Sequence, residues 1–295
     1  MTTSTRPTTF WEEIADVPHT LEYVQVGQWR TRVLTAGSGE TTIVMLAGTS
    51  GHIEAFARNI RALAADNRVI AYDFPGHGYT THATADLEMP QYVEHLRGLL
   101  EVLELDAPVI CGESLGGWIA IKFAGEYPGL VGRLVLSAPG GHMFPEDRLT
   151  FLRELNERVA ANPTWDDVKA RLAVVMHDPE QVTDELVAIR QNIYAQGTFP
   201  ESMHRIMCLH DPEIRFRNRL QDSDLEKIEC PTLFVWTGHE PAGRERGTEL
   251  AALIPQGQFF LVEDAEHWPQ WEDAAAFNER VLTFLADTAT VQVTA

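Results

Sequence analysis

Short apolar stretches rich in β-branched residues alternate along this chain with longer amphipathic stretches. This alternation is typical of a mostly parallel sheet with helices on both faces, and it predicts an α/β fold. The apolar stretches predict eight strands, over residues 21–26, 30–36, 42–46, 68–72, 109–111, 133–137, 232–236 and 258–262. The amphipathic stretches between them predict helices over residues 54–64, 89–104, 118–127, 244–253 and 273–286.

The alternation stops between the sixth and seventh predicted strands. Only helical patterns occur from Phe144 to about Asp224, over residues 149–159, 166–175 and 182–194. We interpret this stretch as an insertion without a sheet of its own, which would form a helical lid. The predicted organisation is a core domain from residues 1–141 and 223–295, with the lid formed by residues 142–222. The tail, residues 287–295, is small and polar and is expected to fray.

Charge and cysteine content narrow the range of partners. The chain has 23 Lys and Arg against 43 Asp and Glu, a net charge of −20, which repels nucleic acid and anionic membranes. Three widely spaced cysteines suit neither a disulfide framework nor a metal site, and residues 1–6 lack the apolar segment of a secretory signal. No apolar run is long enough to span a membrane. We therefore expect a soluble cytoplasmic protein, in which any site for a small anion must supply its own cation.

The motif Gly112-x-Ser114-x-Gly116 lies between the strand predicted at 109–111 and the helix predicted at 118–127. It matches a nucleophile elbow, in which a strained strand-to-helix turn exposes a serine hydroxyl above the sheet. The glycines allow the sharp turn, because side chains there would crowd the neighbouring strands. The alternative is an ordinary serine in a glycine-rich loop.

A serine nucleophile needs a base that is oriented by a third group. His267 follows the last predicted strand, and Glu240 follows the one before it, so the chain order is serine, acid, histidine. Asp264 and Asp73 are reserve candidates for the acid. Acyl chemistry also needs donors for a developing oxyanion. We expect one from the N–H of Leu115 and another from the loop at 47–51.

Within that loop Thr49 is the preferred oxyanion donor, and Gly48 precedes it. The alternative is a flexible connection. No cofactor is expected. A metal site is disfavoured, since His204 and Cys208 form only an isolated helical pair with His210 nearby.

From about Val24 to Leu285 the chain resembles the α/β-hydrolase fold proteins, and within that fold it resembles the meta-cleavage product hydrolases of aromatic degradation. The elbow carries the resemblance to the fold. Four stretches carry the resemblance to the narrower group: residues 114–117 with 134–141, residues 182–186 with Arg190, residues 216–220, and residues 267–272 with 277–278. The run His-Trp-Pro-Gln-Trp-Glu at 267–272 is the most specific of them.

The resemblance implies an enzyme that hydrolyses a C–C bond of a 2-hydroxy-6-oxohexa-2,4-dienoate after the dienol has become a ketone. It implies that Arg190 clamps the substrate's carboxylate and 2-oxo group, and that Trp268 packs beside the reacting carbonyl. The alternatives are an exposed arginine paired with Asp184 or Glu185, and a tryptophan of the core. A homodimer is a further expectation at the level of the family.

Three positions depart from the family pattern. Ala47 stands where these enzymes usually carry His, Glu113 where they carry Asn, and Glu240 where they carry Asp. Glu113 would favour the imidazolium form of His267 and disfavour an anionic substrate. Two other functions therefore stay open: hydrolysis of an ester, lactone or amide by the same three residues, and a non-catalytic receptor that binds a small molecule.

Overall fold

The computed structural model describes residues 9–287. The expectations for residues 1–6 and for the tail beyond Asp287 lie outside this range. Within it, no helix is both long enough and apolar enough to cross a membrane.

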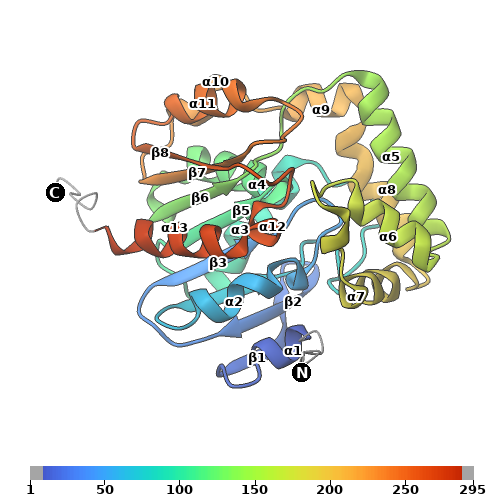
Figure 1. Cartoon of the computed structure of the whole chain (residues 1–295), viewed down its shortest axis with the longest axis horizontal. Coiled ribbons are helices and arrows are strands. Elements are labelled where there is room, and N and C mark those ends of the chain that lie inside the picture. The colour runs from blue at the N-terminus through green and yellow to red at the C-terminus, as the bar shows by residue number, and fades with distance from the viewer. Residues whose placement is uncertain (1–8, 288–295) are drawn as a thin grey trace, which may run out of the picture.

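Eight strands of the described chain form one sheet, and all eight predicted strands are confirmed with ends that differ by a few residues. The strands are β1 (His19–Val26), β2 (Trp29–Ala36), β3 (Thr42–Leu46), β4 (Arg68–Tyr72), β5 (Val109–Glu113), β6 (Arg133–Ser137), β7 (Thr232–Thr237) and β8 (Gly257–Val262). Their order across the sheet is β1-β2-β4-β3-β5-β6-β7-β8 (Figure 1). β1 and β2 form an antiparallel hairpin that turns at Gly27, where φ is 55°, and β2 also pairs antiparallel with β4. The other neighbours are parallel.

The strand order creates a switch point between β3 and β5. From β3 the chain runs outward to β4, whereas from β5 it runs in the other direction to β6, β7 and β8. Connections that leave in opposite directions open a crevice at the carboxyl ends of the two strands, where ligands bind in open α/β sheets. The fold therefore directs attention to the loops that follow β3 and β5.

Helices cover both faces of the sheet. In Figure 1, α2, α12 and α13 lie in front of the strands, and α3 and α4 lie behind them. The helices are α1 (Phe10–Glu13), α2 (Ala57–Leu63), α3 (Met89–Val102), α4 (Leu115–Glu126), α5 (Glu146–Ala161), α6 (Trp165–Ala173), α7 (Asp184–Tyr194), α8 (Phe199–Ile206), α9 (Pro212–Asn218), α10 (Asp222–Glu226), α11 (Arg244–Ala252), α12 (Pro269–Glu272) and α13 (Ala274–Ala286). The predicted start of α4 at residue 118 was wrong, because the helix begins directly after the elbow serine.

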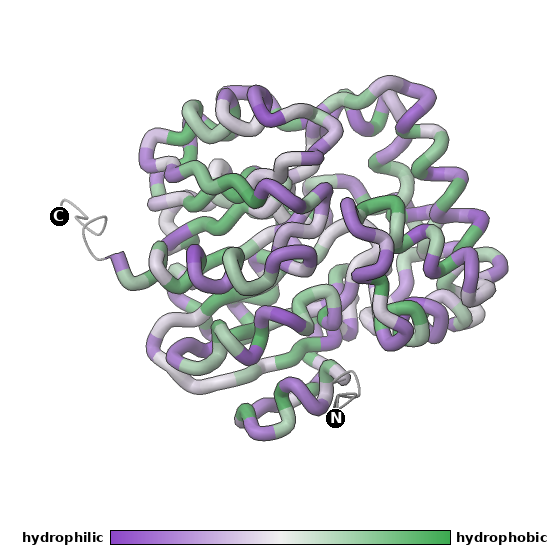
Figure 2. The backbone as a smooth tube through the Cα atoms, in the orientation of Figure 1, coloured by the Kyte–Doolittle hydropathy of each residue, from purple (hydrophilic) through white to green (hydrophobic). Residues whose placement is uncertain are grey.

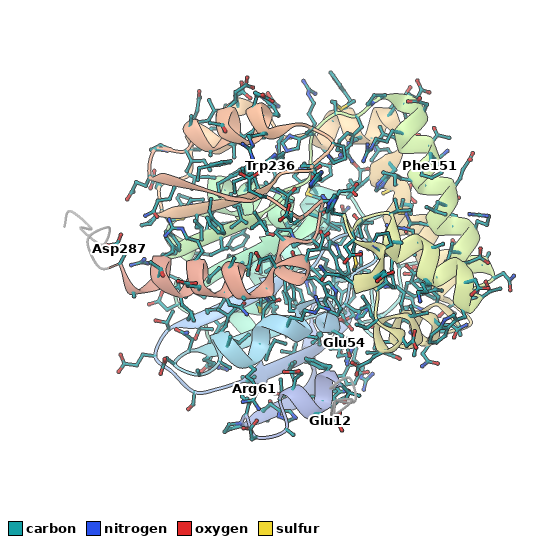
Figure 3. All side chains as sticks on the ribbon, viewed as in Figure 1. Glu12, Glu54, Arg61, Phe151, Trp236 and Asp287 are labelled. Atoms are coloured by element: carbon teal, nitrogen blue, oxygen red, sulfur yellow. The ribbon has the colours of Figure 1, made fainter. Side chains whose placement is uncertain are left out.

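Helices α5 to α9 lie between β6 and β7 in the sequence. This part of the chain contains no strand, as the helical pattern predicted. They gather beside one end of the strands, at the right of Figure 1. The tube in Figure 2 is most hydrophobic along the central strands and carries more polar residues on the outer helices. Two side chains labelled in Figure 3 show the contrast: Trp236 on β7 is buried, whereas Phe151 on α5 is 55% exposed.

Candidate active site

Ser114 lies at the turn between β5 and α4 with φ of 51° and ψ of −111°, a strained backbone conformation for a residue with a side chain. Glycines make the turn possible. A Cβ on Gly112 would lie 2.4 Å from the carbonyl oxygen of Gly116, and one on Gly116 would lie 2.2 Å from the carbonyl oxygen of Leu46. Neither backbone can yield, so the elbow requires glycine at both positions.

The structure brings together the three side chains that the sequence predicted as a catalytic set. Nε2 of His267 lies 2.9 Å from Oγ of Ser114, and Nδ1 of His267 lies 2.8 Å from Oε2 of Glu240. Glu240 is buried on the loop after β7, and His267 lies on the loop between β8 and α12. This is the geometry in which an imidazole can take a proton from a hydroxyl while a carboxylate orients it.

Glu272 holds the loop that carries the histidine. Its carboxylate accepts hydrogen bonds from the N–H groups of Glu266 at 3.0 Å, Trp268 at 3.3 Å and His177 at 2.5 Å. The imidazole rings of His177 and His239 stack with centroids 3.7 Å apart. The segment between α6 and α7 thus contacts both the loop that carries His267 and the loop that carries Glu240.

The protonation of His267 depends on the acids around it. Burial disfavours the imidazolium, but the carboxylates of Glu240 and Glu113 outweigh burial and raise the pKa of His267 to about 9. Glu113 is only 1% exposed, and its Oε1 lies 3.8 Å from Nε2 of His267. Burial raises the pKa of Glu113 to about 7, against the opposing effect of the imidazolium. Each of the two groups therefore influences the ionisation of the other.

Glu113 also explains why position 48, in the loop after β3, is a glycine. A Cβ on Gly48 would lie 2.6 Å from Oε2 of Glu113. Neither oxygen of this carboxyl makes a well-formed hydrogen bond within the described chain, although the N–H of Gly48 lies close enough to lower its pKa. A buried carboxyl without strong hydrogen-bond partners lowers the stability of the fold. Its position beside the nucleophile therefore points to a role in the site.

Two backbone N–H groups remain available in the cavity that contains Ser114. Those of Thr49 and Leu115 donate to no acceptor within residues 9–287, and both residues line the cavity that contains Ser114. Leu115 is the first residue of α4, where helix N–H groups have no partner within the helix. The predicted oxyanion donors therefore line the same cavity as the serine and are free to donate hydrogen bonds to a ligand.

Arg190 enters the same cavity from α7. It is 2% exposed, and its Nη1 donates to Oγ of Ser50 at 3.2 Å and to the hydroxyl of Tyr194 at 3.4 Å. Its Nε and Nη2 are buried without a partner in the described chain. The alternative pairing with Glu185 does not occur, since that carboxylate accepts from the N–H of Phe10. Arg190 therefore carries a buried charge that has no ion-pair partner among residues 9–287.

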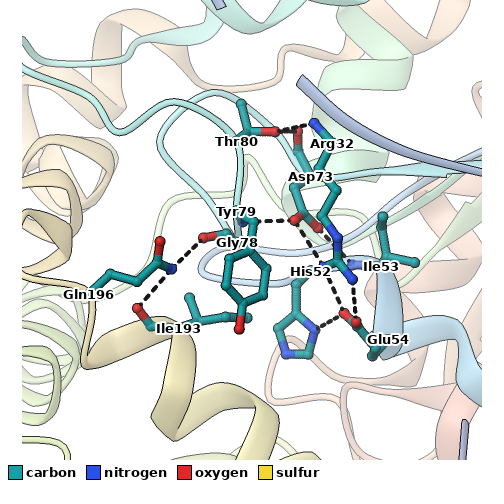
Figure 4. Close-up of polar contacts among 10 residues, drawn as sticks. All are labelled: Arg32, His52, Ile53, Glu54, Asp73, Gly78, Tyr79, Thr80, Ile193 and Gln196. Carbon is teal, nitrogen blue, oxygen red and sulfur yellow. Dashed lines mark hydrogen bonds and ion pairs between the residues drawn. The ribbon is translucent and has the colours of Figure 1, made fainter. Parts of the chain in front are cut away.

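Trp268 is buried and also lines the cavity, and Cζ of Arg190 lies 6.0 Å from its ring centroid. The reserve acids lie elsewhere. Asp264 is exposed, and Asp73 belongs to a buried cluster around Arg32, where it accepts from the N–H groups of Ile53 and Tyr79 (Figure 4). Neither is a hydrogen-bond partner of His267.

Comparison with known proteins agrees with this geometry. Residues 43–280 match the model of a family described as the alpha/beta hydrolase family. The chain belongs to the alpha/beta hydrolase family. Two relatives are each 30% identical over 274 residues, which cover 89% of this chain and 93% of the relative. They are a 2-hydroxy-6-oxononadienedioate/2-hydroxy-6-oxononatrienedioate hydrolase from Comamonas testosteroni and a 2-hydroxy-6-oxo-6-phenylhexa-2,4-dienoate hydrolase from Burkholderia cepacia.

A similar solved structure is the meta-cleavage product hydrolase from Pseudomonas fluorescens IP01. It is 25% identical, has a TM-score of 0.78, and the match covers 90% of this chain and 97% of that one. The resemblance predicted from the motifs is thus confirmed at the level of the family, and the chain is a hydrolase.

Sequence reasoning missed several groups in the cavity of this alpha/beta hydrolase. Arg148, Arg171 and Arg215 line the cavity along with Arg190, and no motif identified them. The three residues weighed as a metal site are dispersed: His204 pairs with Glu157, Sγ of Cys208 donates to the carbonyl of Leu87, and His210 lines the cavity. The helical pattern could not predict which charged residues face inward, because it does not reveal what lies opposite each face.

Proposed function

We propose that this alpha/beta hydrolase is a serine hydrolase that cleaves the C–C bond of a 2-hydroxy-6-oxohexa-2,4-dienoate without a cofactor. The supporting observation is the unpaired guanidinium of Arg190 in the cavity that holds the hydrogen-bonded Ser114, His267 and Glu240. A planar guanidinium with two free donors suits a carboxylate next to a ketone, which is the head group of such substrates. The relatives' activities agree with this choice.

The reaction would start from the keto form, in which the 2-hydroxyl proton has moved to C5. Oγ of Ser114 adds to the C6 carbonyl as its proton passes to Nε2 of His267, while the oxyanion accepts from the N–H groups of Leu115 and Thr49. The C5–C6 bond then breaks, and its electron pair spreads to the oxygen on C2, near Arg190. The imidazolium returns the proton, and 2-hydroxypenta-2,4-dienoate leaves.

Water hydrolyses the remaining acyl-serine ester, and His267 again takes and returns a proton. Glu240 stabilises the imidazolium at each stage through its contact with Nδ1. The helices between β6 and β7 act in this proposal as a lid that excludes bulk water from the acyl-enzyme.

Ester or lactone hydrolysis is the second candidate, and Glu113 is the observation that favours it. A carboxylate 3.8 Å from the catalytic imidazole opposes the entry of an anion, whereas a neutral ester would not be repelled. The same three residues would perform that reaction.

Turnover separates these functions. The purified enzyme is mixed with a yellow ring-fission dienolate and, in parallel, with p-nitrophenyl esters. We expect rapid loss of the dienolate absorbance, and we expect S114A and R190Q each to lower kcat/KM for the dienolate by about a hundredfold or more. R190Q should leave ester hydrolysis within about threefold of wild type, since an ester presents no carboxylate to this guanidinium.

Rapid ester turnover with an unchanged dienolate would reject the C–C reaction. If S114A retained the wild-type rate on every substrate, a receptor function would be favoured instead.

We also propose a cytoplasmic location and a homodimer. The three cysteines of the chain are unpaired and buried, and burial raises the pKa of Cys111 and Cys208 to about 12 and that of Cys230 to about 11, so they suit a reducing compartment. Cell fractionation tests the location, and light scattering on the purified protein tests the dimer.

A further inference from the structure

The connection between α6 and α7, residues 174–183, is anchored to the loop that carries His267. The N–H of His267 donates to the carbonyl of Val175 at 3.3 Å, and the N–H of His177 donates to the carboxylate of Glu272 at 2.5 Å. These two hydrogen bonds run in opposite directions, so the connection and the histidine loop restrain each other.

Gln181 anchors the far end of the same connection. Its Oε1 accepts from Nη1 of Arg58 at 2.6 Å, its Nε2 donates to the carbonyl of Glu272 at 3.2 Å, and its own carbonyl accepts from Nε1 of Trp271 at 3.1 Å. Arg58 lies on α2 and Trp271 on α12, in the layer in front of the sheet in Figure 1. The connection belongs to the insertion between β6 and β7, but hydrogen bonds at both ends fix it to the core.

The side chain of His177 reaches from this connection to the loop after β7. Its imidazole stacks on that of His239, with ring centroids 3.7 Å apart and planes 10° apart. Both residues are exposed, and neither lines the cavity that contains Ser114. The stack therefore lies outside both the hydrophobic core and the cavity, and its effect is to restrain the two segments relative to each other.

Glu240 follows His239 directly, so the position of its carboxylate depends on how firmly His239 is held. The N–H of His239 donates to the carbonyl of Ala265 at 3.1 Å, which ties this loop to the residues after β8. Oε2 of Glu240 must stay within reach of Nδ1 of His267, 2.8 Å away, to orient the imidazole. Small displacements of catalytic groups cost large factors in rate, so a restraint at His239 bears on catalysis.

We infer that His177 and His239 are positioning residues for Glu240, and that the connection between α6 and α7 holds both the acid and the base of the catalytic set in place. The inference rests on the proposed function only for the roles of Ser114, His267 and Glu240, and it applies equally to a C–C substrate and to an ester. The insertion then has a second task besides covering the cavity, which is to keep Glu240 aligned with His267.

Removal of one ring tests the stack. H177A and H239A keep the backbone hydrogen bonds and lose the ring contact, so each should lower kcat for a p-nitrophenyl ester about tenfold and leave KM within about twofold. H177F keeps a ring and should retain kcat within about threefold of wild type, which separates stacking from the electrostatic effect of His177 on Glu266. H204A is the control and should change neither constant, because His204 is an exposed histidine of the insertion that pairs with Glu157.

The E240Q background decides whether the stack acts through Glu240. H177A should change the kcat of E240Q by less than about twofold, because no carboxylate remains to be positioned. H177A/H239A should match either single variant, because both substitutions remove the same contact. A tenfold loss that persists in the E240Q background, or a higher KM without a loss of kcat, would overturn the inference.

Proton NMR tests the alignment without turnover. A proton held between Nδ1 of His267 and Oε2 of Glu240 gives a downfield signal, which H177A should broaden or shift and H177F should restore. If the wild type cleaves esters but not the dienolate, and H177A lowers the ester kcat, the C–C reaction is wrong and the inference stands. If H177A and H239A retain the wild-type kcat and signal, the inference is wrong and the proposed function stands. H239A decides the matter if H177A does not fold.

Discussion

Glu113→Gln should move the pH dependence of this enzyme. Only a neutral imidazole can act as the base, so kcat/KM should rise as pH increases through the pKa of His267, which is about 9. Burial raises the pKa of Glu113 to about 7, so its carboxyl is ionised above that pH and holds the proton on His267 there. Glutamine keeps the shape of the side chain and removes the charge.

The size of the effect follows from the 3.8 Å between Oε1 of Glu113 and Nε2 of His267. Two unit charges at about this distance interact by about 1 kcal/mol in water and about 4 kcal/mol at an effective dielectric constant of 20. At about 1.4 kcal/mol for each pH unit, the pKa of His267 should fall by about one to three units. The acidic limb of the profile should therefore move to lower pH, and kcat/KM near pH 7 should rise about tenfold or more.

The assay is a profile of kcat/KM between about pH 6 and about pH 10 for the wild type and E113Q. Other charged groups that act on His267 are Glu240, which is retained, and the half-buried Glu266. E266Q is the control and should move the limb less, because its influence on His267 is weaker than that of Glu113. An acidic limb that stays in place, or moves to higher pH, would refute the coupling between Glu113 and the base.

Three further changes test the site and the fold. E240Q should lower kcat by about 10³- to 10⁴-fold with an unchanged melting temperature, because an amide can hold the wrong tautomer of the imidazole; a loss below tenfold would show that another acid serves. G116A should lower the urea midpoint sharply, since its Cβ would meet a backbone carbonyl, whereas G129A, with open space around it, should change the midpoint little. R32M should cost about 3 to 5 kcal/mol of unfolding free energy by removing the guanidinium that pairs with two buried carboxylates, and R61M, which breaks an exposed pair, less than about 1 kcal/mol; equal costs would contradict this.

The arrangement of strands could be predicted because parallel strands buried on both faces are continuous apolar runs. The start of α4 could not. Gly116 and Gly117 have low helix propensity, so local preference predicts a later start, but the elbow sets Leu115 as the first helical residue. Packing against β3 then decides the outcome, because the N–H of Gly116 donates to the carbonyl of Ala47.

The sequence by itself determined the candidates for the catalytic set, since a motif marked Ser114 and the order of strands marked Glu240 and His267. Only the tertiary structure decided that their atoms lie within hydrogen-bond distance and that Asp73 is committed to another cluster. The reason is that the three segments are far apart in sequence and meet only where the loops of three strands converge.

Only the tertiary structure decided which charged groups face the cavity, where they would select the substrate. The insertion contains many arginines, and helical periodicity does not distinguish one that faces solvent from one that faces the cavity. Whether a guanidinium has a counter-ion depends on what the rest of the fold places opposite it. For Arg171 the fold places the side-chain oxygen of Asn156 against Nε, and within the described chain no carboxylate forms an ion pair with it; that arrangement cannot be predicted from the residues around it in the chain.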